Sequence, residues 1–257
     1  MTTISNQDFD AAYYFNNTVV WNIIERCNVQ PAPERGLLKA VAVGTGVVNQ
    51  PAEGTLPTDS DFSATTTAFT PKLFVSVGNA TELALMNEGL PVAVQQGLAE
   101  ALKAAVEKEI MEDVLAGAND VAGNTDPANP KIHYATDGLT AVEGWLKMGN
   151  NQNRALMVMH PDIIQDVFKN VPERFHSSLF NFYDIPSLYS SELVPENVGI
   201  IFDPRKVLLV PYQEATITIN DKTNPLKPVL VGRSVYGIHV QDPDSIYVFD
   251  HNNAPSA

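Results

Sequence analysis

Cysteine is nearly absent from this sequence: Cys27 is the only one among 257 residues. An intramolecular disulfide is therefore impossible, which fits synthesis in a reducing cytoplasm. Residues 1–10 are polar and acidic, unlike a secretory signal peptide, and no apolar run approaches the roughly 18 residues that a membrane-spanning helix needs. We therefore expect no membrane partner, and we interpret Cys27 as a buried small hydrophobic residue.

Positive charge is also scarce. The chain has 16 Lys and Arg against 30 Asp and Glu, a formal net charge of −14. A protein that binds nucleic acid tightly by itself needs a basic patch, and the sequence contains no Lys/Arg cluster. Any contact with DNA is therefore expected to be weak and non-specific. Hydrophobic residues make up 44 % of the chain, which is typical of a folded protein with a substantial core.

The sequence contains no recognisable catalytic, cofactor-binding or metal-binding motif. Gly44-Thr45-Gly46 lacks the third glycine of a dinucleotide-binding loop. The run from Gly232 to Gly237 is one residue too long for a nucleophile elbow and lies within a strand pattern. The five histidines do not have the spacing of metal ligands. We therefore predict no catalytic residue, no cofactor and no metal site, and a protein that is not an enzyme.

Residues 37–78 have the pattern of a long β-hairpin. Residues 37–48 are rich in small and β-branched side chains, residues 49–61 have the composition of a turn, and residues 62–77 form a second strand-like run. An isolated two-stranded ribbon is marginal in water. Either this hairpin folds back on its own domain or it lies on another chain.

Residues 91–116 are predicted to form one long helix. Its apolar residues recur every fourth position, at Leu98, Leu102, Val106, Ile110 and Val114. Lys103 and Glu107 are expected on its polar side as a supporting pair, and Gly117 is a plausible C-cap. The helix would span roughly 39 Å at 1.5 Å per residue. A helix and a hairpin of such length predict an elongated molecule.

The remaining segments are shorter. In residues 1–30 apolar side chains recur at roughly helical spacing, and Pro31 ends any helix there. This segment is either a helix at a domain edge or an arm that lies over a neighbouring subunit. Residues 136–204 have an α/β pattern. Strand-like runs then dominate, at 199–202, 207–210, 215–219, 229–240 and 246–249.

One stretch resembles a known family. Ala52-Glu53-Gly54-Thr55-Leu56-Pro57, then Asp61-Phe62, then Thr70-Pro71-Lys72-Leu73, followed by the long helix, are similar to the extended loop and exit strand of tailed-phage major capsid proteins, the Hong Kong 97 fold. The resemblance implies an α+β fold in four parts. These are an N-terminal arm (1–36), an extended loop (37–78), a peripheral domain with a spine helix and long strands (79–135 and 205–241), and an α/β axial domain (136–204 and 242–257).

The resemblance also implies a function. Such proteins self-assemble into hexamers and pentamers of an icosahedral shell that encloses double-stranded DNA in the virion, after synthesis in the host cytoplasm. The partners would be copies of the chain itself, packaged DNA, a portal protein and, in some relatives, a cement or decoration protein. Because the chain begins only about 36 residues before the loop, a separate scaffolding protein, or none, is expected.

The same resemblance selects residues for contacts between subunits. In the extended loop these are Ala52, Glu53, Gly54, Leu56, Pro57, Phe62 and Phe69, and in the arm they are Phe9, Tyr13 and Trp21. The family's founding member joins its subunits by an isopeptide bond from a lysine of this loop. Residues 52–62 contain no lysine. No covalent crosslink is therefore expected.

Three other functions stay open. An encapsulin-type nanocompartment shell shares the fold and would hold an enzyme instead of DNA. An α/β enzyme with an unrecognised acidic site is a second alternative, although no motif supports it. A tail-tube or decoration protein is the third, and the long helix argues against it because those proteins are mainly built of strands.

Overall fold

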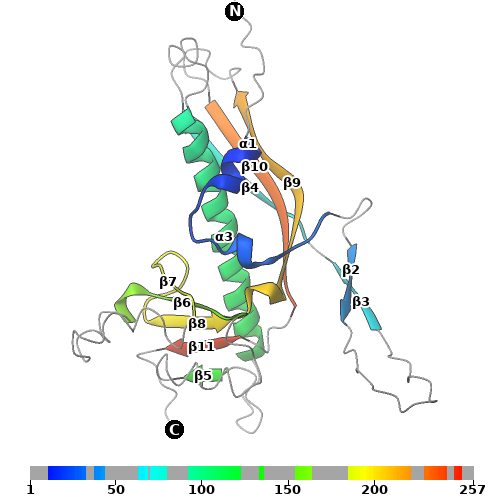
Figure 1. The fold of residues 1–257 in the computed structure, drawn as a ribbon, viewed down its shortest axis with the longest axis vertical. Coiled ribbons are helices and arrows are strands. Elements are labelled where there is room, and N and C mark those ends of the chain that lie inside the picture. The colour runs from blue at the N-terminus through cyan, green and yellow to red at the C-terminus, as the bar shows by residue number, and fades with distance from the viewer. Residues whose placement is uncertain are drawn as a thin grey trace, which may run out of the picture.

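A single long helix runs through most of the molecule (Figure 1). The computed structural model describes residues 11–32, 38–43, 63–68, 70–79, 92–122, 133–135, 154–163, 185–220, 229–241 and 246–250. Helix α3 (Val92–Ala122) has a four-stranded sheet along its upper part and a five-stranded sheet at its lower end. A two-stranded ribbon stands off to one side. The elongated shape predicted from the sequence is confirmed.

Helix α3 buries the apolar stripe that the sequence predicted. Leu98, Leu102, Val106, Ile110 and Val114 are all 6 % exposed or less. The helix is longer than expected, because it continues through Gly117 to Ala122. The prediction that Gly117 caps the helix was wrong. A glycine inside a helix costs only about 1 kcal/mol relative to alanine, so it does not by itself end one.

The four-stranded sheet has the order β1-β9-β10-β4. Strand β1 (Asn28–Val29) is parallel to β9 (Val207–Asn220), and β9, β10 (Val229–Val240) and β4 (Lys72–Asn79) are antiparallel. The runs at 207–210 and 215–219 were predicted as separate strands. They form the single strand β9, because its pairing with β10 continues across the intervening residues despite register shifts.

The five-stranded sheet has the order β5-β11-β8-β6-β7. The bounds of its strands are β5 (His133–Ala135), β6 (Leu156–Met159), β7 (Ser187–Tyr189), β8 (Val198–Phe202) and β11 (Tyr247–Asp250). Side chains on one face, such as Val158 and Ile200, join the same core as α3, and those on the other, such as Met157 and Ile201, form a second core. Strand β11 lies between β5 and β8 in this sheet.

The ribbon pairs β2 (Leu38–Val43) with β3 (Ser63–Ala68) in antiparallel register, from Leu38 opposite Ala68 to Val43 opposite Ser63. The prediction of one continuous strand over 62–77 was wrong, because β3 ends at Ala68 and β4 belongs to the four-stranded sheet. Pro71 lies between them. A proline has no backbone N–H to donate, so it is a natural place for a strand to change partners.

The helix and the sheet are closely packed at Gly232 on β10. A methyl group there would collide with the Ser76 hydroxyl and would lie 3.1 Å from a Leu102 methyl carbon. Any larger residue must therefore displace the Ser76 hydroxyl and crowd the Leu102 side chain. Gly97, on the exposed side of α3, has nothing within 4 Å of a methyl group in the same position.

These two glycines make a matched pair for substitution. Gly232→Ala should lower the free energy of unfolding by about 1–3 kcal/mol through overpacking. Gly97→Ala should raise it by about 0.5–1 kcal/mol, because alanine is the better helix former. Urea unfolding followed by circular dichroism measures both. Equal effects of the two substitutions would contradict the close packing of α3 on β10.

Candidate functional site

The N-terminal segment packs on its own chain over residues 11–32. Helix α1 (Ala11–Asn17) buries Ala11 and Phe15, and the Phe15 ring stacks on Tyr236 of β10 with 5.9 Å between the ring centroids. The helix ends at Asn17, before the β-branched run Thr18-Val19-Val20. The helical spacing of apolar residues across residues 1–30 therefore does not correspond to one continuous helix. This part of the predicted arm is therefore built into the core of the subunit.

The predicted contact residues of the arm lie in different surroundings. Tyr13 is 56 % exposed on α1 and is accessible to a neighbouring molecule. Trp21 is half-buried and packs against the main core of its own chain. Phe9 lies outside the described residues. Tyr13 is thus the better placed of the two for a contact between subunits.

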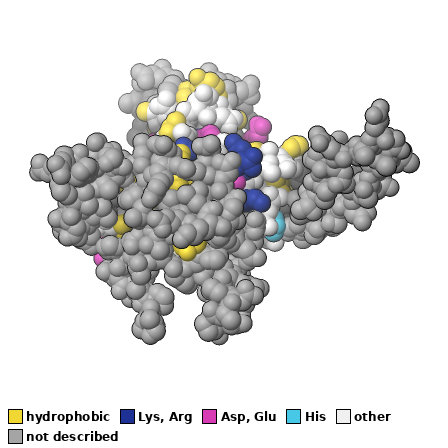
Figure 2. All heavy atoms as spheres, turned by 60° about the horizontal axis from the view of Figure 1, so that its bottom comes forward, with side chains coloured by type: hydrophobic (Ala, Val, Ile, Leu, Met, Phe, Trp, Pro, Cys, Tyr) yellow, Lys and Arg dark blue, Asp and Glu magenta, His cyan; other side chains and the backbone are white. Residues whose placement is uncertain are grey.

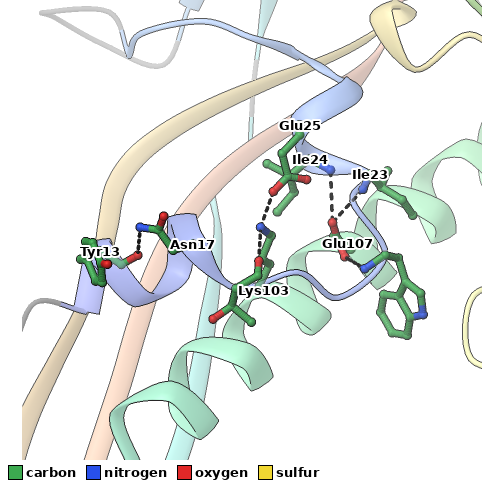
Figure 3. A network of polar contacts seen from close by, with 9 residues as sticks. Tyr13, Asn17, Ile23, Ile24, Glu25, Lys103 and Glu107 are labelled. Atoms are coloured by element: carbon green, nitrogen blue, oxygen red, sulfur yellow. Dashed lines mark hydrogen bonds and ion pairs between the residues drawn. The ribbon is translucent and has the colours of Figure 1, made fainter. Parts of the chain in front are cut away.

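Glu107 on α3 binds the backbone of this segment. Its carboxylate is fully buried and accepts hydrogen bonds from the backbone N–H groups of Trp21, Ile23 and Ile24, at 2.9, 2.8 and 3.3 Å (Figure 3). Burial raises the pKa of Glu107, and the three N–H donors act in the opposite direction. The carboxylate satisfies backbone groups that have no partner in a regular helix or strand.

Lys103, one helical turn before Glu107, binds the same segment. Its side chain is 1 % exposed, and its ammonium donates to the Thr18 carbonyl at 2.6 Å and pairs with Glu25 (Figure 3). The two helix residues thus hold the segment from Thr18 to Glu25. The prediction that they lie on the polar side of the helix was wrong. In the sequence Lys103 and Glu107 directly follow Leu102 and Val106 of the apolar stripe. This position was the signal that could have indicated their burial.

Cys27 lies next to this network, in surroundings that disfavour ionisation of its thiol. Burial, followed by the nearby charges of Glu107 and Glu25, raises the pKa of its thiol to about 12. The thiol therefore stays protonated near neutral pH. Its prediction as a buried small residue is confirmed.

A second ion pair fixes the base of the ribbon. Lys72, the first residue of β4, lies 2.6 Å from Glu109 and 2.7 Å from Asp113 on α3. Although burial lowers the pKa of Lys72, its hydrogen bonds to Asp113 and Glu109 outweigh that effect and raise it. The lysine also offsets the repulsion between the two carboxylates, which are four residues apart on one helix. Strand β4 is thereby attached to α3 just after the ribbon ends.

The ribbon itself has little support from its own subunit. In the part of the chain that the structure describes, β2 and β3 pair only with each other, and Figure 1 shows them projecting away from the body. The predicted loop contacts Ala52, Glu53, Gly54, Leu56, Pro57, Phe62 and Phe69 lie outside the described residues. Among the described residues, the base of the hairpin is therefore a two-stranded element that no further strand extends.

The described surface carries few features of a chemical site. Within the described ranges no group of three or more His, Cys, Asp and Glu could hold a metal ion. Among the described helices, none has both the length and the hydrophobicity to cross a membrane. Figure 2 shows Lys and Arg side chains gathered at one place, beside a histidine and near acidic side chains. Positive charge among the coloured residues of that view is thus confined to a small area.

No family model matches this sequence, and no curated protein matches it either. Solved structures do match over nearly the whole chain. A virus-like particle from Pyrococcus furiosus matches with a TM-score of 0.59 and 13 % identity, over 93 % of this chain and 96 % of that one. The capsid of cyanophage P-SCSP1u matches with 0.58 and 14 %, over 87 % and 85 %. The mature capsid of bacteriophage PhiM1 matches with 0.55 and 11 %, over 93 % and 90 %.

These likenesses define the fold. At such identities they show a shared architecture, and the chain has the α+β capsid fold of the Hong Kong 97 type that its sequence predicted. The matches extend over about nine tenths of the chain and so are not confined to one part of it.

The clamp on the N-terminal segment can be tested by substitution. Glu107→Ala should lower the free energy of unfolding by about 2–4 kcal/mol, because buried N–H groups lose their acceptor. It should also speed tryptic cleavage after Arg26, which lies in the segment. Glu112→Ala, an exposed position of the same helix, should change stability by less than about 0.5 kcal/mol. Unchanged protection of Arg26 in Glu107→Ala would show that other contacts hold the segment.

The state of Cys27 predicts slow thiol chemistry. At pH 8 a thiol with a pKa of about 12 is ionised roughly 10³-fold less than an ordinary cysteine, so the native protein should react with a disulfide reagent at least that much more slowly. In guanidinium chloride one thiol per chain should react at the ordinary rate. Rapid labelling of the native protein would place Cys27 at the surface.

Proposed function

We propose that this chain is the shell subunit of an icosahedral particle, the major capsid protein of a tailed double-stranded DNA phage. The observation that carries the proposal is the ribbon β2–β3, which projects from a subunit with the capsid fold and pairs with nothing else in the described structure. A two-stranded ribbon is marginal in water. Its natural support is a neighbouring copy of the chain, where it buries apolar surface at ~25 cal/mol per Å².

The proposal includes the arrangement of the subunit in hexamers and pentamers. The axial part (136–204 and 242–257) would meet its copies around the fivefold and sixfold axes, and the peripheral part (79–135 and 205–241) would meet them at the threefold axes. The extended loop (37–78) and the arm (1–36), with Tyr13 exposed, would contact neighbours. The proposal also includes a portal protein, a separate scaffolding protein and a cement protein as partners of the shell. Assembly would take place in the host cytoplasm.

The acidic net charge of the chain affects how the shell would interact with packaged DNA. With a net charge of −14 the wall would repel packaged DNA weakly and leave it free to move. Contacts with DNA would be weak and non-specific. Strong salt-dependent binding of DNA by purified subunits would contradict this part of the proposal.

A second candidate is an encapsulin-type nanocompartment shell. The match to a virus-like particle from Pyrococcus furiosus, which covers 96 % of that chain, is the observation that keeps this candidate beside the phage capsid, because that particle is described as virus-like and not as a phage. The two candidates share the assembly and differ in what the shell encloses. Nuclease-protected DNA in particles from the natural source supports the phage capsid, and an enclosed enzyme supports the nanocompartment.

Assembly is tested by sedimentation and negative-stain microscopy of the purified protein. We expect megadalton shells or their capsomers. Since Val43 lies opposite Ser63, a two-residue Asn-Gly turn can replace residues 44–62 and keep the base of the ribbon. This variant should unfold at the same urea concentration as the full chain and assemble at least tenfold less. A compact monomer of the full chain at high concentration would overturn the shell assignment.

A further inference from the structure

Strand β8 of the five-stranded sheet has charges of opposite sign at its two ends. The turn over residues 190–197, which leads into β8 (Val198–Phe202), carries acidic side chains, and the 3₁₀ turn η5 (Pro204–Lys206), which follows β8, carries basic ones. In Figure 1 the turn before β8, near the β7 label, lies to the left of α3, and η5, in yellow, lies to its right. The two charges are therefore on different sides of the subunit.

The basic end of β8 collects side chains from several elements. Arg205 and Lys206 are exposed in η5. Strand β6 is antiparallel to β8, so the exposed Arg154, just before β6, lies at the same end. Strand β1 is parallel to β9, which follows η5, so the exposed Arg26, just before β1, lies there as well. These four residues form the basic patch.

The basic patch is held in place by its own chain. The Asp203 carboxylate accepts a hydrogen bond from the backbone N–H of Arg205 at 3.0 Å, which fixes the turn that presents this arginine. Arg26, Arg154 and Arg205 form no ion pair with another described residue. Glu25, next to Arg26, pairs with Lys103 instead. The patch therefore keeps its positive charge for a further partner.

The acidic turn at the other end of β8 is equally well anchored. Its exposed acids, Glu192 and Glu196, flank Leu193 and Val194, which are both 3 % exposed. The backbone N–H of Glu192 donates to the Ser190 hydroxyl at 3.1 Å. Neither glutamate forms an ion pair with another described residue. Two carboxylates are thus presented on a turn that is fixed by buried side chains.

The two charged ends of one chain are too far apart to pair with each other. A strand of five residues spans roughly 17 Å at about 3.3 Å per residue. This exceeds the reach of an ion pair, about 4 Å, and the screening length at physiological salt, about 8 Å. Copies of a chain with a net charge of −14 repel each other on average, and they attract in the orientation in which an acidic turn meets a basic patch.

We propose that the basic patch receives the acidic turn of a second copy of the chain in a ring of subunits, a step that rests on the proposed shell function. Complementary surfaces on different sides of one subunit make a head-to-tail contact, which can close into a ring. Opposite charges steer the encounter of two copies and fix their orientation. Because both turns are held by hydrogen bonds within their own chain, little further ordering is needed on contact.

Charge reversal tests the contact. Arg154→Glu with Arg205→Glu reverses the patch, and Glu192→Arg with Glu196→Arg reverses the turn. At physiological salt each reversed chain should yield about tenfold fewer particles or capsomers than the wild-type chain, because like charges then face each other. A chain with all four substitutions has the wild-type net charge and opposite charges at the contact, so it should assemble within about threefold of the wild-type yield.

A control separates the contact from the change in net charge. Lys108→Glu with Arg233→Glu makes the same change in net charge at two exposed positions away from the patch, and it should leave the yield unchanged. Urea unfolding at the same midpoint as the wild-type chain shows that the reversed subunits are intact.

Mixing shows whether the contact joins different chains. The patch-reversed and the turn-reversed chain each face like charges alone, but each offers the other a complementary surface. In an equimolar mixture the two chains should alternate around a ring, which an even-numbered ring permits and an odd-numbered ring does not. Native mass spectrometry should therefore detect mixed hexamers with equal numbers of the two chains, and no pentamers.

The outcomes separate the contact from the shell function. Mixed hexamers support both. Normal assembly of the patch-reversed chain overturns the contact and leaves the shell function standing, and a simultaneous loss of nuclease-protected DNA would assign the patch to DNA. Loss of assembly that neither mixing nor the fourfold variant restores overturns the acidic turn as the partner. A wild-type chain that forms no capsomer or particle overturns the shell function, and the contact with it.

Discussion

The packing of helix α3 is the constraint on which the rest of the subunit depends. One stripe of α3 is buried against β9, β10 and β4, and the core that it forms extends to the five-stranded sheet. Glycine at position 232 keeps β10 close to Leu102. In the described structure the sheet packs on α3 and on α1, and this packing buries apolar side chains of its strands.

The charged residues of α3 attach the other segments to this core. Lys103 and Glu107 bind the backbone between Thr18 and Glu25, and Glu109 and Asp113 bind Lys72 at the start of β4. A buried charge without a partner destabilises the folded state. Lys103 and Glu107 therefore favour the one path of the N-terminal backbone that gives both of them hydrogen-bond partners. The N-terminal segment is thereby held in one position, and the ribbon leaves the body from a fixed point.

The long elements could be predicted because their signals are local. The apolar stripe of α3 repeats every fourth residue, and the strand over 229–240 is continuous in sequence and in structure. Two of the corrections concern the partners of strands. Whether the runs in β9 join, and whether β4 belongs to the ribbon or the sheet, depends on which distant strand pairs with them. No local pattern contains that information.

By itself the sequence determined the spine helix, the strand over 229–240, the low positive charge and the buried cysteine, since periodicity and composition depend on neighbouring residues. The class of fold followed from the resemblance to a known family. Only the tertiary structure decided that Lys103 and Glu107 face inward, that residues 11–32 belong to the core, and that charges of opposite sign gather at the two ends of β8. Those features are set by contacts between residues far apart in the sequence, such as Glu107 with Trp21, 86 positions away, and Phe15 with Tyr236. Their energy comes from burial and hydrogen bonds that exist only once the chain has folded.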